Sequence, residues 1–204
     1  MTVTDSRSDA RIPMLDVADA RAAAARVDVP ARMAELSVFK VLLRHEELAA
    51  RVNALLHQLL WKGVLDARLR ELIIMRIGWR QGSLYEWTQH WRVARMIDIA
   101  EDDLLAVRDW KASDRFDRAD RAVLAATDET LGAGAISTAT WAELEAAVPD
   151  EKARIEVVIA IANWSMFAQL LRSLEVPLEE GVDPWPPDGA VPEPARRPVP
   201  SELR

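Results

Sequence analysis

The spacing of hydrophobic residues along the chain predicts helices almost throughout. From residue 31 to residue 60, apolar side chains recur every three or four positions, with a break near His45 that separates two helices. A third helix is expected after Asp66, which can cap it. Gly82 and Ser83 interrupt the pattern, and a further helix is expected over about residues 84–97.

The second half of the chain continues this pattern. Helices are expected over residues 101–107, from Asp117 or Asp120 to Leu131, over 137–148 and over 150–174. In the last of these, the residues expected to point inward are Ile155, Val158, Ile159, Ala162, Met166 and Leu170. No stretch shows the sustained alternation of apolar and polar residues that is typical of half-buried strands. The pattern therefore predicts an all-α protein.

The two ends of the chain differ from this helical middle. Residues 1–30 are rich in Ala, Arg and Asp, with one or two amphipathic turns expected around Val17 to Val27. Eight of the eleven prolines follow Val176, and such a segment forms neither a helix nor a central strand. We therefore expect an N-terminal arm (1–30), a helical domain (31–178) and an extended C-terminal tail (179–204). The tail is either disordered or strapped across a neighbouring subunit, where Trp185 would gain from burial.

Composition and charge narrow the possible functions. The net charge of −7 comes from interspersed acids and bases, which argues against a nucleic-acid-binding surface. The absence of cysteine excludes disulfides, thiolate metal sites, iron–sulfur clusters and a cysteine nucleophile. No uninterrupted apolar run approaches the roughly 18–20 residues of a membrane span, and the polar start of the chain lacks a signal-peptide core. We therefore expect a cytoplasmic protein without membrane or nucleic acid as a partner.

Candidate chemistry gathers on the two helices that flank the break at Gly82. Ser83, Glu86 and His90 are spaced by three and four residues, so they lie along one helix face. Glu86 can then bond the His90 imidazole, orient it and stabilise its protonated form. Such a couple is a common acid–base unit, because histidine titrates near neutrality. Glu71 lies on the preceding helix and can meet His90 if the two helices pack as a hairpin.

Neighbouring residues complete the candidate site. Met75, Trp79 and Trp87 are expected to form an apolar pocket wall, and Ser83 and Tyr85 are further candidates for substrate binding. Structural roles compete with these: Ser83 can simply cap the following helix, Tyr85 can pack at an interface, and Glu71 has arginines within reach at positions 68, 70 and 76. A metal site made of Glu71, Glu86 and His90 is a further alternative, but three ligands without a second histidine make a poor signature.

The run LDARLRELIIMRIGWRQGSLYEWTQHWRVARMIDIAEDDL resembles the core of the carboxymuconolactone decarboxylase family, which includes the alkylhydroperoxidase D (AhpD) proteins. In the peroxidase branch of that family, a glutamate falls at Glu71, two cysteines fall at Ser83 and Glu86, and a histidine falls at His90. This chain keeps both outer residues and lacks both cysteines. The resemblance covers about residues 35–178, and it implies an AhpD-like helical bundle built around a helix hairpin.

The missing cysteines decide which activity the resemblance implies. Peroxide reduction in this family uses a dithiol that forms a disulfide, and neither Ser83 nor Glu86 can replace it. The decarboxylase branch implies a cofactor-independent lyase or isomerase that moves a proton on a small carboxylate or lactone, with His90, Glu86 and Glu71 as catalytic residues and no metal. A metal-assisted enzyme and a non-catalytic binding or assembly protein stay open as alternatives. Members of the family assemble as trimers or hexamers, so the resemblance also implies a homo-oligomer.

Overall fold

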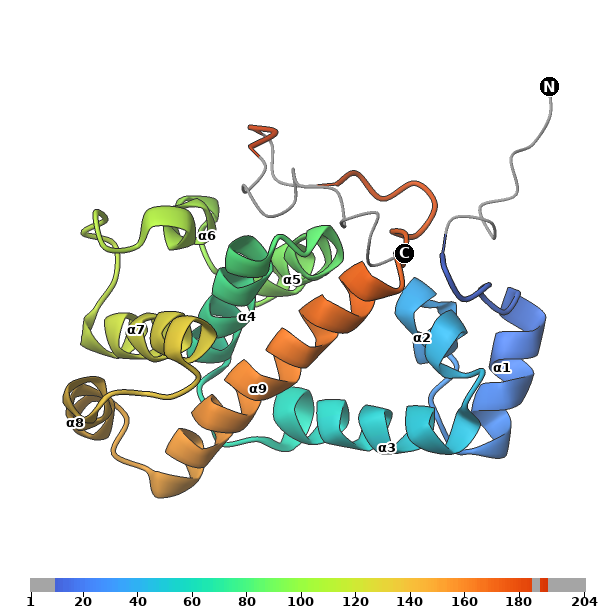
Figure 1. Ribbon diagram of the computed structural model, residues 1–204, viewed down its shortest axis with the longest axis horizontal. Helices are drawn as coiled ribbons and strands as arrows, with labels where there is room; N and C mark the ends of the chain where they lie inside the picture. Colours follow the sequence, from blue (N-terminus) through green and yellow to red (C-terminus); the bar gives the residue numbers. More distant parts are fainter. Residues whose placement is uncertain (1–9, 185–187, 191–204) are drawn as a thin grey trace. The chain divides into compact units, whose positions relative to one another are not determined.

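The computed structural model describes residues 10–184 and 188–190, in which helices are joined by turns and no strand occurs (Figure 1). The chain forms two compact units. Among the described residues, the first unit contains residues 10–62 together with Leu170–Val182. The second contains Gly63–Gln169 together with residues 183–184 and 188–190. The prediction of an all-α protein is confirmed.

The first unit is built from α1 (Val17–Arg26), α2 (Ser37–Leu42) and α3 (Glu46–His57), with a 3₁₀ turn at Met33–Glu35 and a π turn at Gln58–Lys62. The helix α1 forms where amphipathic turns are expected in the N-terminal arm, and Asp16 caps it by accepting from the Asp19 amide. The break between α2 and α3 falls at His45, as predicted, and the His45 side chain caps α3.

The segment that follows the last helix is bonded to the start of the first unit. The Arg11 amide donates to the Leu174 carbonyl at 2.8 Å. The Ser37 amide donates to Glu179 Oε1, also at 2.8 Å. The predicted docking role of Trp185 lies outside the described residues.

The second unit is centred on α4 (Ala67–Gln81), which packs against α5 (Leu84–Met96) and α7 (Arg118–Ala133). The short helix α6 (Glu101–Ala106) and a 3₁₀ turn at Val107–Asp109 connect α5 to α7, and α8 (Thr138–Ala147) packs against α7 (Figure 1). The last helix, α9 (Glu151–Ser173), contributes most of its length to this unit. The long side chains of α4 are buried over most of the helix, as its central position requires.

The helices α4 and α5 form the hairpin that carries the candidate chemistry. Asp66 caps α4 by accepting from the Arg68 and Leu69 amides. The helix ends at Gln81, and the residue that caps it, Gly82, has a φ of 67° in the left-handed region that favours glycine. At Gly78, an added Cβ would lie 3.1 Å from the backbone nitrogen of Trp87. Glycine at this position therefore lets the two helix backbones approach closely.

The buried face of α9 differs from the prediction. Ile155, Val158, Ile159 and Met166, which were expected to point inward, are between 40% and 63% exposed, and Ala162 is exposed as well. The buried residues of this helix are Ala153, Val157, Ala160, Ile161, Asn163, Trp164, Phe167, Ala168 and Leu171. Because α9 is apolar on most of its faces, its helical period does not select one face for burial.

The helix α9 is also the one helix of the described residues that is long and apolar enough to cross a membrane, judged by length and composition alone. Half of its apolar window is buried within the protein. The core helix of a soluble protein has the same length and composition, so this property is weak evidence for a membrane span.

Candidate active site

The helix hairpin brings Glu71 of α4 and His90 of α5 into direct contact. Glu71 Oε2 lies 2.8 Å from His90 Nδ1, which is a good hydrogen-bond distance. The Glu71 side chain has no exposed surface, and the His90 side chain is 12% exposed. The contact that was expected only if the helices pack as a hairpin is therefore present.

Glu71 lies between two bonding partners. Its other carboxylate oxygen, Oε1, accepts from Arg70 Nε at 3.0 Å. A buried carboxylate needs such partners, because removing an unpaired charge from water is costly. Glu71 therefore binds both of the partners expected for it. Arg70 is the structural partner and His90 is the chemical one.

Glu86 lies one helical turn before His90 but is not its hydrogen-bond partner. Glu86 Oε2 is 3.6 Å from His90 Nε2, beyond hydrogen-bond distance, and this oxygen has no hydrogen-bond partner among the described residues. The sequence favours Glu86 as the residue that orients His90, whereas the structure gives that contact to Glu71. Spacing along one helix cannot reveal a shorter contact made from a neighbouring helix.

The surroundings of Glu86 change its acidity. Burial raises the pKa of Glu86 to about 7, although the nearby charge of His90 lowers it, and the charge of Glu71 raises it further. Glu86 therefore exchanges a proton near neutral pH. A carboxyl group with such a pKa is suited to act as a general acid.

Trp164 of α9 is a site residue that the sequence pattern does not indicate. Its indole Nε1 donates to His90 Nε2 at 3.1 Å, and the two rings meet edge to face, with centroids 5.8 Å apart at 88°. Trp164 is buried, with 1% exposure. The only available signal is general: a buried tryptophan usually finds an acceptor for its N–H group.

Two opposing influences act on His90. Burial lowers the pKa of His90, but the charge and hydrogen bond of Glu71 and the charge of Glu86 raise it, and the net effect is a pKa above the ordinary value for histidine. The N–H group of Trp164 acts in the opposite sense, because it occupies the lone pair on Nε2 that protonation needs.

The other residues expected in the site cap a helix or pack in the protein interior. Ser83 is buried and caps α5 by accepting from the Glu86 amide, which is the structural role considered for it. Met75 and Trp87 are fully buried in a hydrophobic cluster, with Trp79 packed against it, so the expected pocket wall is packed core. Tyr85 is also buried, with 6% exposure.

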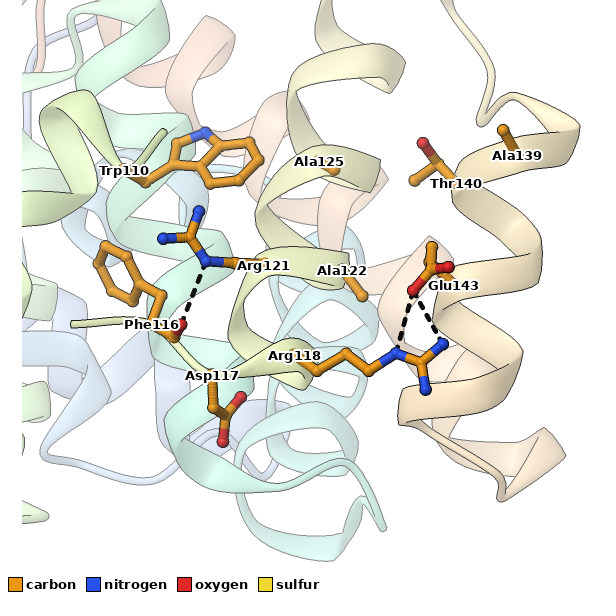
Figure 2. Close-up of a pocket in the computed structure, with 10 residues that line it drawn as sticks. All are labelled: Trp110, Phe116, Asp117, Arg118, Arg121, Ala122, Ala125, Ala139, Thr140 and Glu143. Atoms are coloured by element: carbon orange, nitrogen blue, oxygen red, sulfur yellow. Dashed lines mark hydrogen bonds and ion pairs between the residues drawn. The ribbon is translucent and has the colours of Figure 1, made fainter. Parts of the chain in front are cut away.

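Two cavities of the second unit are lined by residues other than His90. One of about 590 Å³ lies between α7, α8 and the segment from Trp110 to Asp117, as Figure 2 shows. A second, of about 320 Å³, is lined by residues of α4, α7 and α9 that include Gln81, Ser165 and Gln169. Neither is lined by Glu71, Glu86 or His90. The His90 side chain is 12% exposed and Trp164 is bonded to its Nε2, so a substrate that bonds Nε2 must displace the indole N–H group.

The metal alternative gains no support from this geometry. Among residues 10–184 and 188–190, no group of three or more His, Asp or Glu side chains is arranged to hold a metal ion. In the proposed ligand set, both ring nitrogens of His90 lie at hydrogen-bond distance from protein groups.

Comparisons with known proteins bear on the family and the fold of this chain. Residues 46–129 match the Carboxymuconolactone decarboxylase family. No curated protein matches the chain by sequence.

Solved structures share the fold at low sequence identity. The alkylhydroperoxidase AhpD core of a peroxidase-related protein from Ralstonia eutropha JMP134 has a TM-score of 0.71 and 17% identity, covering 86% of this chain and 95% of that chain. A peroxidase-related protein from Silicibacter sp. TM1040 has a TM-score of 0.67 and 14% identity, covering 89% and 97% of the two chains. The debrominase Bmp8, in complex with 2,3,4-tribromopyrrole, has a TM-score of 0.61 and 19% identity, covering 71% and 76%.

The matched segment contains α4, α5 and the three candidate acid–base residues, Glu71, Glu86 and His90. The structural match to the Ralstonia eutropha protein covers 86% of this chain, which is more than the segment matched by the family. Residues 46–129 are therefore similar to the carboxymuconolactone decarboxylase family, and the chain lacks the cysteines of the peroxidase branch of that family.

Proposed function

We propose that this protein is a cofactor-independent lyase or isomerase that moves a proton on a small carboxylate- or lactone-like molecule. The observation that carries the proposal is the buried arrangement around His90. One ring nitrogen is held by Glu71 at 2.8 Å, and the other faces Glu86, whose pKa of about 7 lets it exchange a proton near neutrality.

Each side chain has a distinct task in this proposal. Glu71 accepts from Nδ1–H, so the lone pair of His90 is on Nε2, where it can remove a proton from a substrate. Glu86, in its protonated form, can donate a proton to the carbanion or enol that loss of a carboxylate leaves. General acid–base catalysis of this kind contributes roughly 10²–10⁴-fold to a rate.

The low exposure of His90 limits the substrate to a small molecule. Its side chain is 12% exposed, and Trp164 covers Nε2. The debrominase Bmp8 has a similar fold and binds 2,3,4-tribromopyrrole, a small ring compound, which supports a ligand of that size here. The absence of cysteine argues against any thiol-dependent reaction in this chain.

A panel of small lactone acids and carboxylates tests the proposal. Release of carbon dioxide and uptake of solvent deuterium would be measured for the wild type, His90→Gln and His57→Gln, since His57 is an exposed histidine of α3. We expect turnover of at least one compound, a loss of about 100-fold or more in His90→Gln, and full activity in His57→Gln. Unchanged turnover in a folded His90→Gln variant would overturn the proposal.

A second candidate, a non-catalytic binding protein, is favoured by one specific observation. His90 Nε2 is already bonded to Trp164, while a cavity of about 590 Å³ lies elsewhere, between α7 and α8. If compounds of the panel raise the melting temperature without turnover, this candidate gains. Ala125→Trp, which places a large side chain in that cavity, should then abolish the rise in melting temperature.

A further inference from the structure

We infer that Trp164 is a positioning residue that keeps the exchangeable proton of the site on Glu86 rather than on His90. The inference rests on the proposed function, because it assigns the resting proton to one of the two acid–base groups. It has consequences that can be measured in the free protein, without a substrate.

The first step concerns the atom that Trp164 contacts. An indole N–H only donates, so the 3.1 Å contact between Trp164 Nε1 and His90 Nε2 requires Nε2 to be the acceptor. Nε2 is therefore unprotonated in this arrangement. Burial of Trp164 at 1% exposure, with its ring edge-on to the imidazole, holds the N–H group in place.

The second step concerns the other ring nitrogen. With Nε2 unprotonated, Nδ1 carries the proton of the neutral imidazole and donates it to Glu71 Oε2 at 2.8 Å. Both nitrogens of neutral His90 are then satisfied. If Nε2 gained a proton, two N–H groups would face each other, and the buried indole would lose its acceptor at a cost in free energy.

The third step concerns Glu86. Its Oε2 lies 3.6 Å from His90 Nε2 and has no hydrogen-bond partner among the described residues. A protonated Glu86 avoids burying an unpaired carboxylate. The charged groups that act on His90 are Glu71 and Arg70 from α4 and Glu86 from α5, whereas α9 contributes the neutral indole of Trp164.

These three steps assign different protonation states to Glu86 and His90. In the resting protein, the proton available for donation sits on Glu86. His90 stays neutral because the N–H group of Trp164 offsets the effect of Glu71, whose charge and hydrogen bond raise the pKa of His90. Removal of the indole donor would allow that proton to move to Nε2, which would convert the pair into a carboxylate and an imidazolium. Trp164 thus decides which of the two groups starts a reaction as the acid.

The test is ¹⁵N NMR of the histidine rings in the wild type, Trp164→Phe and Trp110→Phe. The chain has three histidines, so His90→Gln assigns the His90 signals. Trp110→Phe is a matched control, because Trp110 is also a buried indole donor of this unit but bonds Asp128 Oδ2 at 3.0 Å.

At a fixed pH near 7, we expect the ratio of imidazolium to neutral imidazole at His90 to rise on the order of tenfold in Trp164→Phe, because one buried hydrogen bond that favours the neutral ring is lost. Trp110→Phe should leave that ratio unchanged. An unchanged ratio in a folded Trp164→Phe variant would overturn the inference.

A second measurement covers the case in which Trp164→Phe does not fold. In the wild type, the indole ¹H signal of Trp164 should move as His90 gains its proton, and a constant signal through that titration would overturn the inference. Neither readout depends on turnover. Loss of turnover in His90→Gln with unchanged ring signals in Trp164→Phe would leave the proposed function standing and reject only the role of Trp164.

Discussion

The pairing of His90 with Glu71 is the residue-scale feature on which the chemistry depends. The two residues come from different helices, and their contact of 2.8 Å is shorter than the 3.6 Å contact with Glu86, four residues before His90. The charge of Glu71 favours the protonated ring, while Arg70 and Trp164 oppose it. The balance at His90 therefore depends on partners from three helices.

Glu71→Gln tests the contribution of that carboxylate. Because the charge and hydrogen bond of Glu71 raise the pKa of His90 against the effect of burial, the substitution should lower that pKa. An NMR titration of the His90 ring would measure the change. Glu143→Gln, which removes a carboxylate from an exposed ion pair with Arg118, is the control and should have no effect. A His90 pKa that stays the same or rises in Glu71→Gln would contradict the expectation.

Glu86→Gln tests the raised pKa through stability. Burial raises the pKa of Glu86 from its ordinary 4.5 to about 7, so the folded state binds this proton more tightly than the unfolded state. The resulting stability is fully present below pH 4.5 and is lost as the pH rises through 7, by on the order of 3 kcal/mol. We would measure the free energy of unfolding in urea at pH 5 and at pH 8. Between these two pH values, Glu86→Gln should lose less of this free energy than the wild type. Equal losses in the two proteins would contradict the raised pKa.

The sequence indicates three of the four residues that form the candidate site, which are Glu71, Glu86, His90 and Trp164. Glu71, Glu86 and His90 stand out because they are polar groups at helical spacing among apolar ones. Trp164 lies 74 positions after His90, and a tryptophan in an apolar helix looks like any other core residue. The hydrogen-bond partners of these residues depend on how the helices pack. The periodicity of a single helix carries no information about that packing.

At the scale of secondary-structure elements, local signals predict helix ends better than helix faces. Asp66, Gly82 and Ser83 mark the ends of α4 and the start of α5, because capping and a left-handed turn are local requirements. The buried face of α9 depends on the neighbouring helices, and an amphipathic stripe is absent from a helix that is apolar on most faces.

Gly78→Ala tests the close approach of α4 and α5. The added Cβ would lie 3.1 Å from Trp87 N, a backbone atom that cannot move independently of its helix. Overpacking of this kind costs about 1–3 kcal/mol, against about 1 kcal/mol gained in helix propensity, so we expect net destabilisation in urea unfolding.

Gly132→Ala is the matched control for this substitution. Gly132 also lies within a helix, α7, but an added Cβ would meet nothing within 4 Å. This variant should be more stable than the wild type by up to about 1 kcal/mol. Stabilisation of both variants by similar amounts would show that the hairpin accommodates a Cβ at Gly78, and it would contradict the expected close approach of α4 and α5.

At the scale of the whole molecule, the property to be measured is the oligomeric state. Ile155, Val158, Ile159 and Met166 form an exposed apolar face on α9. We propose, with the family resemblance, that the protein is a homo-oligomer, and light scattering should give three or six times the 22.8 kDa of one chain. A particle with the mass of one chain would contradict this proposal.

The acid–base site itself is tested most directly by a ¹³C NMR titration of the Glu86 carboxyl group in the free protein. We expect a midpoint near 7, because burial disfavours the carboxylate, and a matching change at His90, because the two groups interact. A midpoint near the ordinary 4.5, with no change at His90, would show an exposed and independent carboxyl group and would contradict the central claim.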